Sequence, residues 1–354
     1  MPTLGRSSSQ LEIENDGISR RYLPRVDAYM KCIEAALERR KTYEDREGDG
    51  SLDDIFNNDP AIADLNLSKE ILPYISRNTI KNTIQETLRF ADSNGLDLLK
   101  LPEPAWLKEA KGDLNAWKEK GALHRFKAVE RDRAGLLAEQ WKNTFDRIPA
   151  GSHCLDIGCG SGFFVRKMQE NHPKLHWRAT DLERAMPING TEDAREKQTW
   201  FKQCEIGKPL PYADASMDVI TLNNVLHHVD VAGLSRMEQG GDNFSPVEYV
   251  NPVAFKQFIQ EVKRVLKPGG KLLVTEEFNG ERIGDGKQGF PVTIDSLFWR
   301  KDPGSQKPIK EWERIVEKFG GFKENEKPRI VGTFGTPGIP VMEVCMTYQK
   351  PKAA

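Results

Sequence analysis

The sequence predicts an α/β domain built on a mostly parallel sheet that ends in an antiparallel hairpin, preceded by an all-α N-terminal region. After Pro149, short apolar runs alternate with helical stretches, which is typical of a parallel sheet with helices on both faces. The last two apolar runs, 327–334 and 341–349, enclose the turn-rich segment GTPGIP, which predicts a hairpin. Before residue 150, apolar residues recur at helical spacing without β alternation.

The chain divides into three predicted units. Residues 1–20 are polar and carry three consecutive serines, so we expect a disordered tail. Residues 21–148 form the helical N-terminal region, in which the apolar spacing predicts helices near 21–39, 68–93 and 105–147. Residues 149–354 form the α/β domain, and the region before it is expected to cover a substrate pocket or to pair subunits.

Within the α/β domain, strands are expected wherever a short apolar run is bounded by turn residues or a helical stretch. These runs are HCLDIG, LHWRATD, TWFKQCEI, MDVITLNN, GKLLVTEEF, KPRIVGTF and VMEVCMTYQ. Helices are expected between several of the runs, at about 161–171, 224–229, 252–267 and 308–319. Alternating strands and helices favour one sheet with helices on both faces, here with seven strands.

Composition excludes several classes of function. The 354 residues contain 52 Lys and Arg against 53 Asp and Glu, and this balance disfavours a general binder of nucleic acid phosphates. No apolar run is long enough for a membrane span, and the first residues lack the apolar core of a secretory signal, so a cytoplasmic location is expected. Five scattered cysteines with no histidine at metal spacing predict reduced thiols and no metal site: Cys32, Cys154, Cys159, Cys204 and Cys345.

The strongest local signal is the segment Asp156-Ile157-Gly158-Cys159-Gly160-Ser161-Gly162, between an apolar strand and the helical stretch FFVRKMQE. Glycines at such a place permit tight backbone turns and let a ligand approach the start of a helix. The spacing is DxGxGxG, which differs from the GxGxxG fingerprint of dinucleotide-binding proteins. The motif therefore predicts a ligand site at the end of the first strand, of a type that the spacing alone does not fix.

The order of features downstream narrows that prediction. The second strand ends in Asp181, whose carboxylate is expected at the carboxyl edge of the sheet, where ligands bind in open α/β folds and an acid can hold a ribose diol. Glu205 follows at the end of the third strand, and the turn PLPY and the strand MDVI come next.

Four blocks in this order, LDIGCGSG, ATDLE, PLPYADASMDVITLNNVLHHV and EVKRVLKPGGKLLVTEE, resemble the class I S-adenosylmethionine-dependent methyltransferases. The resemblance is to the broad group that includes the ubiquinone and menaquinone C-methyltransferases and many small-molecule O- and N-methyltransferases. It covers residues 149–349 and implies a Rossmann-like seven-stranded methyltransferase sheet. It also implies the cofactor S-adenosylmethionine, with S-adenosylhomocysteine as the product.

The resemblance implies roles for seven residues. It assigns the acid and the glycines of the first motif to the methionine and ribose parts of the cofactor: Asp156, Gly158, Gly160 and Gly162. Asp181 is assigned to the ribose hydroxyls and Asn223 to the floor near the methionine. Where the family often has Asp, this chain has Glu205, so either Glu205 reaches the adenine amino group or Ile206 and the backbone bind that ring.

A general base is needed only if the acceptor arrives protonated, because the methyl group of a sulfonium is already activated. His227 and His228 follow the fourth strand, and histidine suits proton transfer near neutrality. Glu276 and Glu277 end the fifth strand, where alternation should turn one toward the pocket and the other away. The candidate catalytic residues are therefore His227, His228 and Glu276.

The expected activity is methyl transfer to oxygen, nitrogen or carbon of a small organic acceptor. Regions outside the common core should roof the acceptor pocket, namely the surroundings of His124–Phe126, the insert 231–251 and the aromatic segment 289–300. A protein or RNA methyltransferase that docks through the helical region is the main alternative, and a non-methylating cofactor binder is the second. Nucleic acid is the less favoured partner, and a homodimer through the helical region is open.

Overall fold

The fold was analysed in a computed structural model of the chain. The structure describes residues 91, 96, 101–103, 105–113, 122–181, 200–204, 208–227, 229, 252–277, 309–334 and 340–352. The helices are α6 (Ala105–Gly112), α8 (Ala122–Phe145), α9 (Phe163–Asn171), α12 (Pro252–Val265) and α14 (Ile309–Gly320). The strands are β1 (His153–Ile157), β2 (His176–Asp181), β3 (Phe201–Gln203), β4 (Met217–Asn223), β5 (Leu266–Glu277), β6 (Lys323–Phe334) and β7 (Pro340–Gln349).

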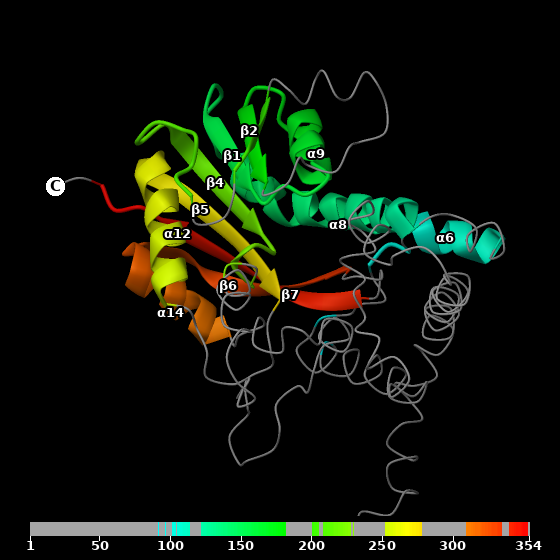
Figure 1. The fold of residues 1–354 in the computed structure, drawn as a ribbon. Helices are drawn as coiled ribbons and strands as arrows, with labels where there is room; N and C mark the ends of the chain where they lie inside the picture. The colour runs from blue at the N-terminus through cyan, green and yellow to red at the C-terminus, as the bar shows by residue number, and fades with distance from the viewer. Residues whose placement is uncertain are drawn as a thin grey trace, which may run out of the picture.

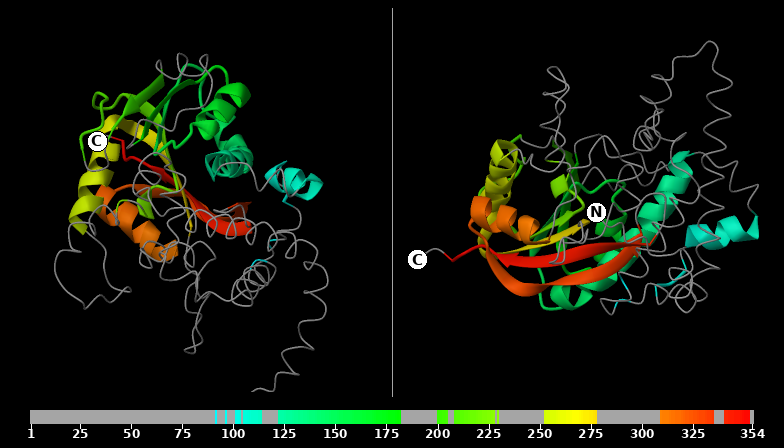
Figure 2. Two further views of the ribbon diagram at one scale, coloured as in Figure 1. Left: turned by 45° about the vertical axis from the view of Figure 1, so that its right-hand side comes forward. Right: turned by 90° about the horizontal axis from the view of Figure 1, so that it is seen from below.

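The seven strands form one sheet in the order β3-β2-β1-β4-β5-β7-β6. Strands β1 to β5 pair in parallel, whereas β7 runs antiparallel to both β5 and β6. The mostly parallel sheet with a final hairpin is therefore confirmed, and Figure 2 shows that hairpin, β6 and β7, as a long bowed pair. The strand order reverses between β1 and β4, which is where ligands bind in open α/β sheets.

The helices cover both faces of the sheet, α12 and α14 on one and α8 and α9 on the other (Figure 1). Side chains alternate along each strand, so Leu155 and Ile157 face the first pair of helices while Cys154 faces the second. Each face consequently has its own hydrophobic core.

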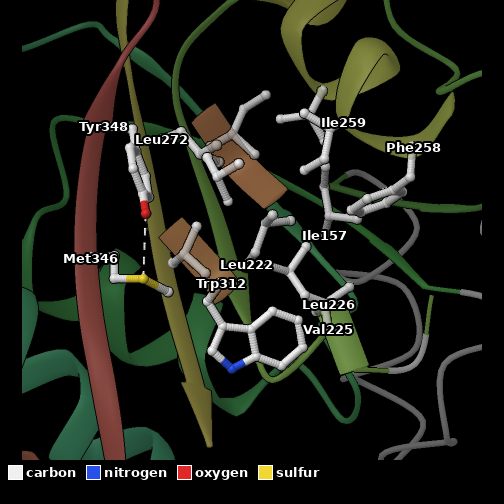
Figure 3. Packing of buried hydrophobic residues seen from close by; sticks show 14 of the residues in the cluster. Ile157, Leu222, Val225, Leu226, Phe258, Ile259, Leu272, Trp312, Met346 and Tyr348 are labelled. Carbon is white, nitrogen blue, oxygen red and sulfur yellow. Dashed lines mark hydrogen bonds between the residues drawn. The ribbon is translucent and has the colours of Figure 1, made fainter. Parts of the chain in front are cut away.

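On the face covered by α12 and α14, the core is almost entirely apolar (Figure 3). Trp312 of α14 lies beside Leu222 and the segment that follows β4, and its indole nitrogen donates to the carbonyl of Glu277 at 3.0 Å. The Tyr348 hydroxyl lies 3.4 Å from the sulfur of Met346, as the dashed line in Figure 3 marks. Burying large side chains of this kind is the main source of stability in such a domain.

On the other face, α8 packs through Trp141 and Phe145, both of which are buried. The Phe145 ring lies 5.2 Å from that of Trp177 on β2, and the Trp141 indole donates to the Thr275 hydroxyl on β5 at 3.2 Å. Helix 105–147 is thus observed as two helices, α6 and α8, of which α8 is part of the layered fold. The predicted unit boundary at 148/149 stays a prediction, as do the expectations for residues 1–90, all of which lie outside the described residues.

Three strands differ in length from the sequence expectation. Strand β6 begins at Lys323 rather than at Lys327. Strand β5 begins at Leu266 rather than at Gly270, because Leu266 and the segment KPGG already have strand conformation. The pairing of β5 with β4 shifts register there, between Met217 and Val219 of β4. Strand β3 has only three residues. In the described part of the chain, none of the helices has the length and apolar character that crossing a bilayer requires.

Candidate functional site

The glycine motif forms the turn between β1 and α9, at the carboxyl edge of the sheet. Gly158, Gly160 and Gly162 all have positive φ, at 72°, 49° and 77°, and Gly162 immediately precedes the first residue of α9. Residues with a side chain rarely adopt this backbone region, so glycine at these positions has a conformational reason.

The turn also has no room for side chains at these glycines. A Cβ on Gly158 would stand 2.5 Å from a methyl of Val225, and one on Gly160 would stand 2.6 Å from Oε1 of Glu130. The glycine loop, residues 158–162, is therefore a tight cradle between the segment after β4 and helix α8.

Asp181 lies at the end of β2, directly against this loop. Its Oδ2 accepts a hydrogen bond from the Gly160 N–H at 2.7 Å. The second carboxylate oxygen is thus held at the same edge of the sheet as the glycines, as the sequence predicted for a ribose ligand.

Asp156 turns away from the loop and toward β4. It is 2% exposed, and its Oδ1 accepts from the Thr221 hydroxyl at 2.6 Å and from the Asn223 amide at 3.2 Å. Burial raises the pKa of this carboxyl to about 7, against the lowering effect of those two hydrogen bonds. Asp156 therefore ties the ends of β1 and β4 together, and its proposed contact with a cofactor remains a prediction.

His227 and Glu276 are brought together at the carboxyl ends of β4 and β5. The His227 Nδ1 lies 2.8 Å from Glu276 Oε2, and the other oxygen of Glu276 accepts from the backbone N–H groups of Val225 and Leu226. Glu276 is fully buried. Two backbone N–H groups donate to this carboxylate, which favours its ionised form. An ionised Glu276 would accept from a protonated His227 Nδ1 and would place the basic lone pair on Nε2.

Glu277 points to the opposite face of the sheet, as strand alternation predicts. Its carboxylate lies 3.4 Å from the Arg133 guanidinium of α8, and Arg133 also binds Glu343 of β7. Asn224, in a left-handed conformation with φ 58°, donates to Glu343 at 2.8 Å. These buried charges fix α8 to the ends of β5 and β7.

Residues 155–274, about a third of the chain, match a family model described as a methyltransferase domain. The chain carries a class I S-adenosylmethionine-dependent methyltransferase domain. The resemblance inferred from the four sequence blocks is therefore confirmed, and so is the seven-stranded fold that it implied.

Two curated relatives of the methyltransferase domain are O-methyltransferases. The sterigmatocystin 8-O-methyltransferase of Aspergillus parasiticus is 25% identical over 184 residues, which cover 52% of this chain and 38% of the relative. The malonyl-[acyl-carrier protein] O-methyltransferase of Alcanivorax borkumensis is 27% identical over 154 residues, covering 42% and 44% of the two chains. The match thus spans less than half the length of either relative.

Among solved structures, the match to a SAM-dependent methyltransferase from Methanosarcina mazei has a TM-score of 0.41 at 18% identity. It covers 60% of this chain and 98% of that protein. The match to phosphoethanolamine N-methyltransferase 2 from Haemonchus contortus, in complex with S-adenosyl-L-methionine, has a TM-score of 0.42 at 14% identity, and it covers 64% and 57% of the two chains.

Sequence reasoning missed two residues that α8 brings to this edge of the sheet, Glu130 and Arg133. The sequence contained a signal for their inward orientation. Positions 130, 133, 137 and 141 are three or four residues apart and therefore lie on one side of a helix, and Leu137 and Trp141 on that side are buried. Charged residues that continue an apolar stripe point at the interior rather than at solvent.

Several predicted residues lie outside the described part of the chain. These are Glu205, His228, the insert 231–251 and the aromatic segment 289–300. The backbone of His124–Phe126 belongs to α8, but their side chains are not described.

Proposed function

We propose that this protein transfers a methyl group from S-adenosylmethionine to a small organic acceptor that arrives protonated, and that His227 removes the acceptor proton. The observation that carries the proposal is the pairing of His227 with buried Glu276 beside the glycine loop. Val225, which lies against Gly158, connects the two features, because it is two residues before His227. The base and the predicted cofactor site are therefore parts of one edge of the sheet.

The residues present fit the cofactor. The backbone of the glycine loop packs so closely against its neighbours that a Cβ would clash there, and Asp181 stands at the rim of the loop. Within the described residues, the buried Oδ1 of Asn223 and the Oγ1 of Thr180 have no hydrogen-bond partner, so polar atoms next to the loop remain for a ligand. When bound, S-adenosylmethionine supplies a methyl group on a positively charged sulfur, which needs no further activation.

The chain's own residues then have two tasks. The glycine loop and Asp181 hold the adenosyl group, which fixes the direction of in-line attack. His227 would accept the acceptor's proton at Nε2, which would leave the acceptor atom able to take the methyl group that the cofactor supplies. Glu276 is a positioning residue, since it holds the imidazole through Nδ1 and stabilises the imidazolium that forms.

A hydroxyl acceptor suits this arrangement best. A carboxylate or a free thiolate needs no base, whereas an alcohol or phenol must lose its proton during transfer. The printed names of the two curated relatives, both O-methyltransferases, support transfer to oxygen. The proposal is accordingly O-methylation of a small hydroxyl-bearing compound.

The proposal also concerns the cellular location of the enzyme and the role of its helical region. The four cysteines in the described residues are free thiols, which supports a reducing, cytoplasmic location. The packing of α8 on the sheet supports a helical region, residues 21–148, whose last helix contacts the methyltransferase domain and which covers the pocket or pairs two subunits. Sedimentation of the full chain tests the pairing.

The test is turnover of methyl-labelled S-adenosylmethionine by the full chain with a panel of small phenols and alcohols and with a size-fractionated extract. We expect label in the small-molecule fraction and a kcat that falls by about 10²–10⁴-fold in His227→Ala. Glu276→Gln, which still accepts from the backbone N–H groups, should lose less. His176→Ala is the matched control, because His176 is exposed at the start of β2, at the other edge of the sheet.

Three results would count against the proposal in different ways. An unchanged kcat in His227→Ala would remove the histidine as base. Label found only in macromolecules would replace the small acceptor by a protein or RNA. Failure of the unmodified protein to bind S-adenosylmethionine in calorimetry would remove the methyltransferase activity itself.

A further inference from the structure

The glycine loop offers few backbone donors to a ligand, because the loop itself uses them. The N–H groups of Gly158 and Cys159 donate to the Thr180 carbonyl, and that of Gly162 donates to the Cys159 carbonyl. The Gly160 N–H donates to Asp181. A phosphate-binding loop keeps such groups free for an anion, so this loop is poorly suited to an anionic ligand.

Carboxylates surround the loop instead. Asp181 lies on one side, and on the other Glu130 projects from α8 so that its Oε1 would stand 2.6 Å from a Cβ on Gly160. The two acids come from separate elements, β2 and α8, and meet at one glycine. An arrangement of this kind attracts a cation and groups that donate hydrogen bonds.

Glu130 forms no ion pair among the described residues. Arg133, one turn further along α8, instead binds Glu343 and Glu277. The Glu130 Oε2 is buried, and no donor among the described residues makes a well-directed hydrogen bond to it. The hydroxyl of Ser161, a residue that is only 1% exposed, also lacks such a bond. Ser161 nevertheless lies close enough to favour the charged form of Glu130. A hydrogen-bond donor on a ligand would satisfy the Glu130 Oε2.

We propose that Glu130 binds the α-ammonium group of the methionine part of S-adenosylmethionine, an inference that rests on the proposed function. The amino-acid end of this cofactor carries the ammonium cation, and the loop beside Glu130 is the place that the family pattern assigns to the methionine. Glu130 thereby recognises a part of the cofactor that takes no part in the transfer. It is a cofactor-binding residue that also fixes where the sulfonium lies.

The electrostatics of Glu130 agree with this role. The pKa of Glu130 is raised to about 7, because burial, the largest cause, and to a lesser extent Asp181 raise it by more than Ser161 and Arg133 lower it. These are the groups of the glycine loop, β2 and α8 that act on this carboxyl. An ammonium ion at Oε2 would favour the ionised form, so cofactor binding should release a proton near neutral pH.

The test is calorimetric titration of the full chain with S-adenosylhomocysteine and with 5′-methylthioadenosine, which lacks the amino-acid end. In Glu130→Gln we expect S-adenosylhomocysteine to bind about tenfold or more weakly, because a charge-assisted hydrogen bond is lost. Binding of 5′-methylthioadenosine should change by less than about twofold. Glu139→Gln, at an exposed position of the same helix, should bind both ligands as the unmodified protein does.

A pH series adds a readout that a structural role would not move. Between pH 6 and 7.5, the affinity of the unmodified protein for S-adenosylhomocysteine should rise several-fold as free Glu130 loses its proton, and the rise should vanish in Glu130→Gln. Equal weakening of both ligands, or no weakening of either, would overturn the proposal. If the unmodified protein binds neither ligand, the proposed function itself fails, which is a distinguishable result.

Discussion

The two faces of the sheet differ in polarity at its carboxyl edge, where neighbouring residues of one strand point to opposite faces. At the carboxyl edge, Ile157 and Leu222 point into the apolar core under α12 and α14. Their strand neighbours Asp156, Thr221 and Asn223 point toward α8 and form a hydrogen-bonded polar cluster. The same strands thus build an apolar core on one face and the Asp156 cluster on the other, while buried Glu276, which shares a face with Leu272 and Val274, borders the apolar core.

This comparison implies that substitutions on the two faces should have different effects on the protein. Changes on the apolar face should lower the free energy of unfolding and leave the ligand site intact in the molecules that remain folded. Changes on the polar face should act through charges and hydrogen bonds, and their effects should depend on pH or on the partner left behind.

The largest effect is expected for Trp312→Ala on the apolar face. Trp312 is fully buried and its indole hydrogen bond to Glu277 would also be lost, so the free energy of unfolding should fall by about 3–5 kcal/mol. Urea unfolding at pH 7 measures this. Val253→Ala on α12 is the control, because Val253 is 62% exposed and should change stability by less than about 0.5 kcal/mol. A small loss at Trp312 would mean that the apolar face can repack.

A somewhat smaller effect is expected for Arg133→Met on the polar face. The substitution leaves Glu343, which is fully buried, without its cation, and breaking a buried pair in this way costs about 3 kcal/mol. The double variant Arg133→Met with Glu343→Gln should recover part of that loss. Arg329→Met is the control, since Arg329 is exposed over the Trp141 ring. An equal loss in the single and double variants would show that Arg133 acts through packing alone.

A third effect, spread over several pH units, is a change of slope with pH at Asp156. Its pKa is raised to about 7 in the folded protein, against about 3.9 in an unfolded chain, so between these values the folded state binds more protons. The free energy of unfolding should therefore fall as pH rises from 4 to 7, by at most about 1.4 kcal/mol per pH unit, and then level off. Asp156→Asn should flatten this slope in urea unfolding curves. An identical slope in both proteins would show that Asp156 is ionised throughout.

The sequence was sufficient for the fold because each strand is short, apolar and bounded by turn residues. It was also sufficient to gather the glycine loop, Asp181, Asn223, His227 and Glu276 at one edge, since parallel strands place their carboxyl ends together. That Glu276 and Glu277 point to opposite faces was predictable, because successive side chains of a strand alternate.

The sequence was insufficient for contacts made by α8. Glu130 and Arg133 are ordinary charged residues of a helix, and only the packing of α8 against the sheet turns them toward the glycine loop and Glu343. The orientation of Asp156 was within reach of the sequence, because Asp156 shares a strand face with buried Cys154. Its partner Thr221 required the pairing of β1 with β4.

Strand β7 has a consequence for how the protein is made. It is the last strand among the described residues, yet it lies inside the sheet between β5 and β6, and it supplies Glu343 to the anchor of α8. The ribosome must therefore finish the segment 340–349 before β5 finds its second neighbour and α8 its ionic contact. Until then the nascent chain exposes the unpaired edge of β5, where chaperones or aggregation would act first.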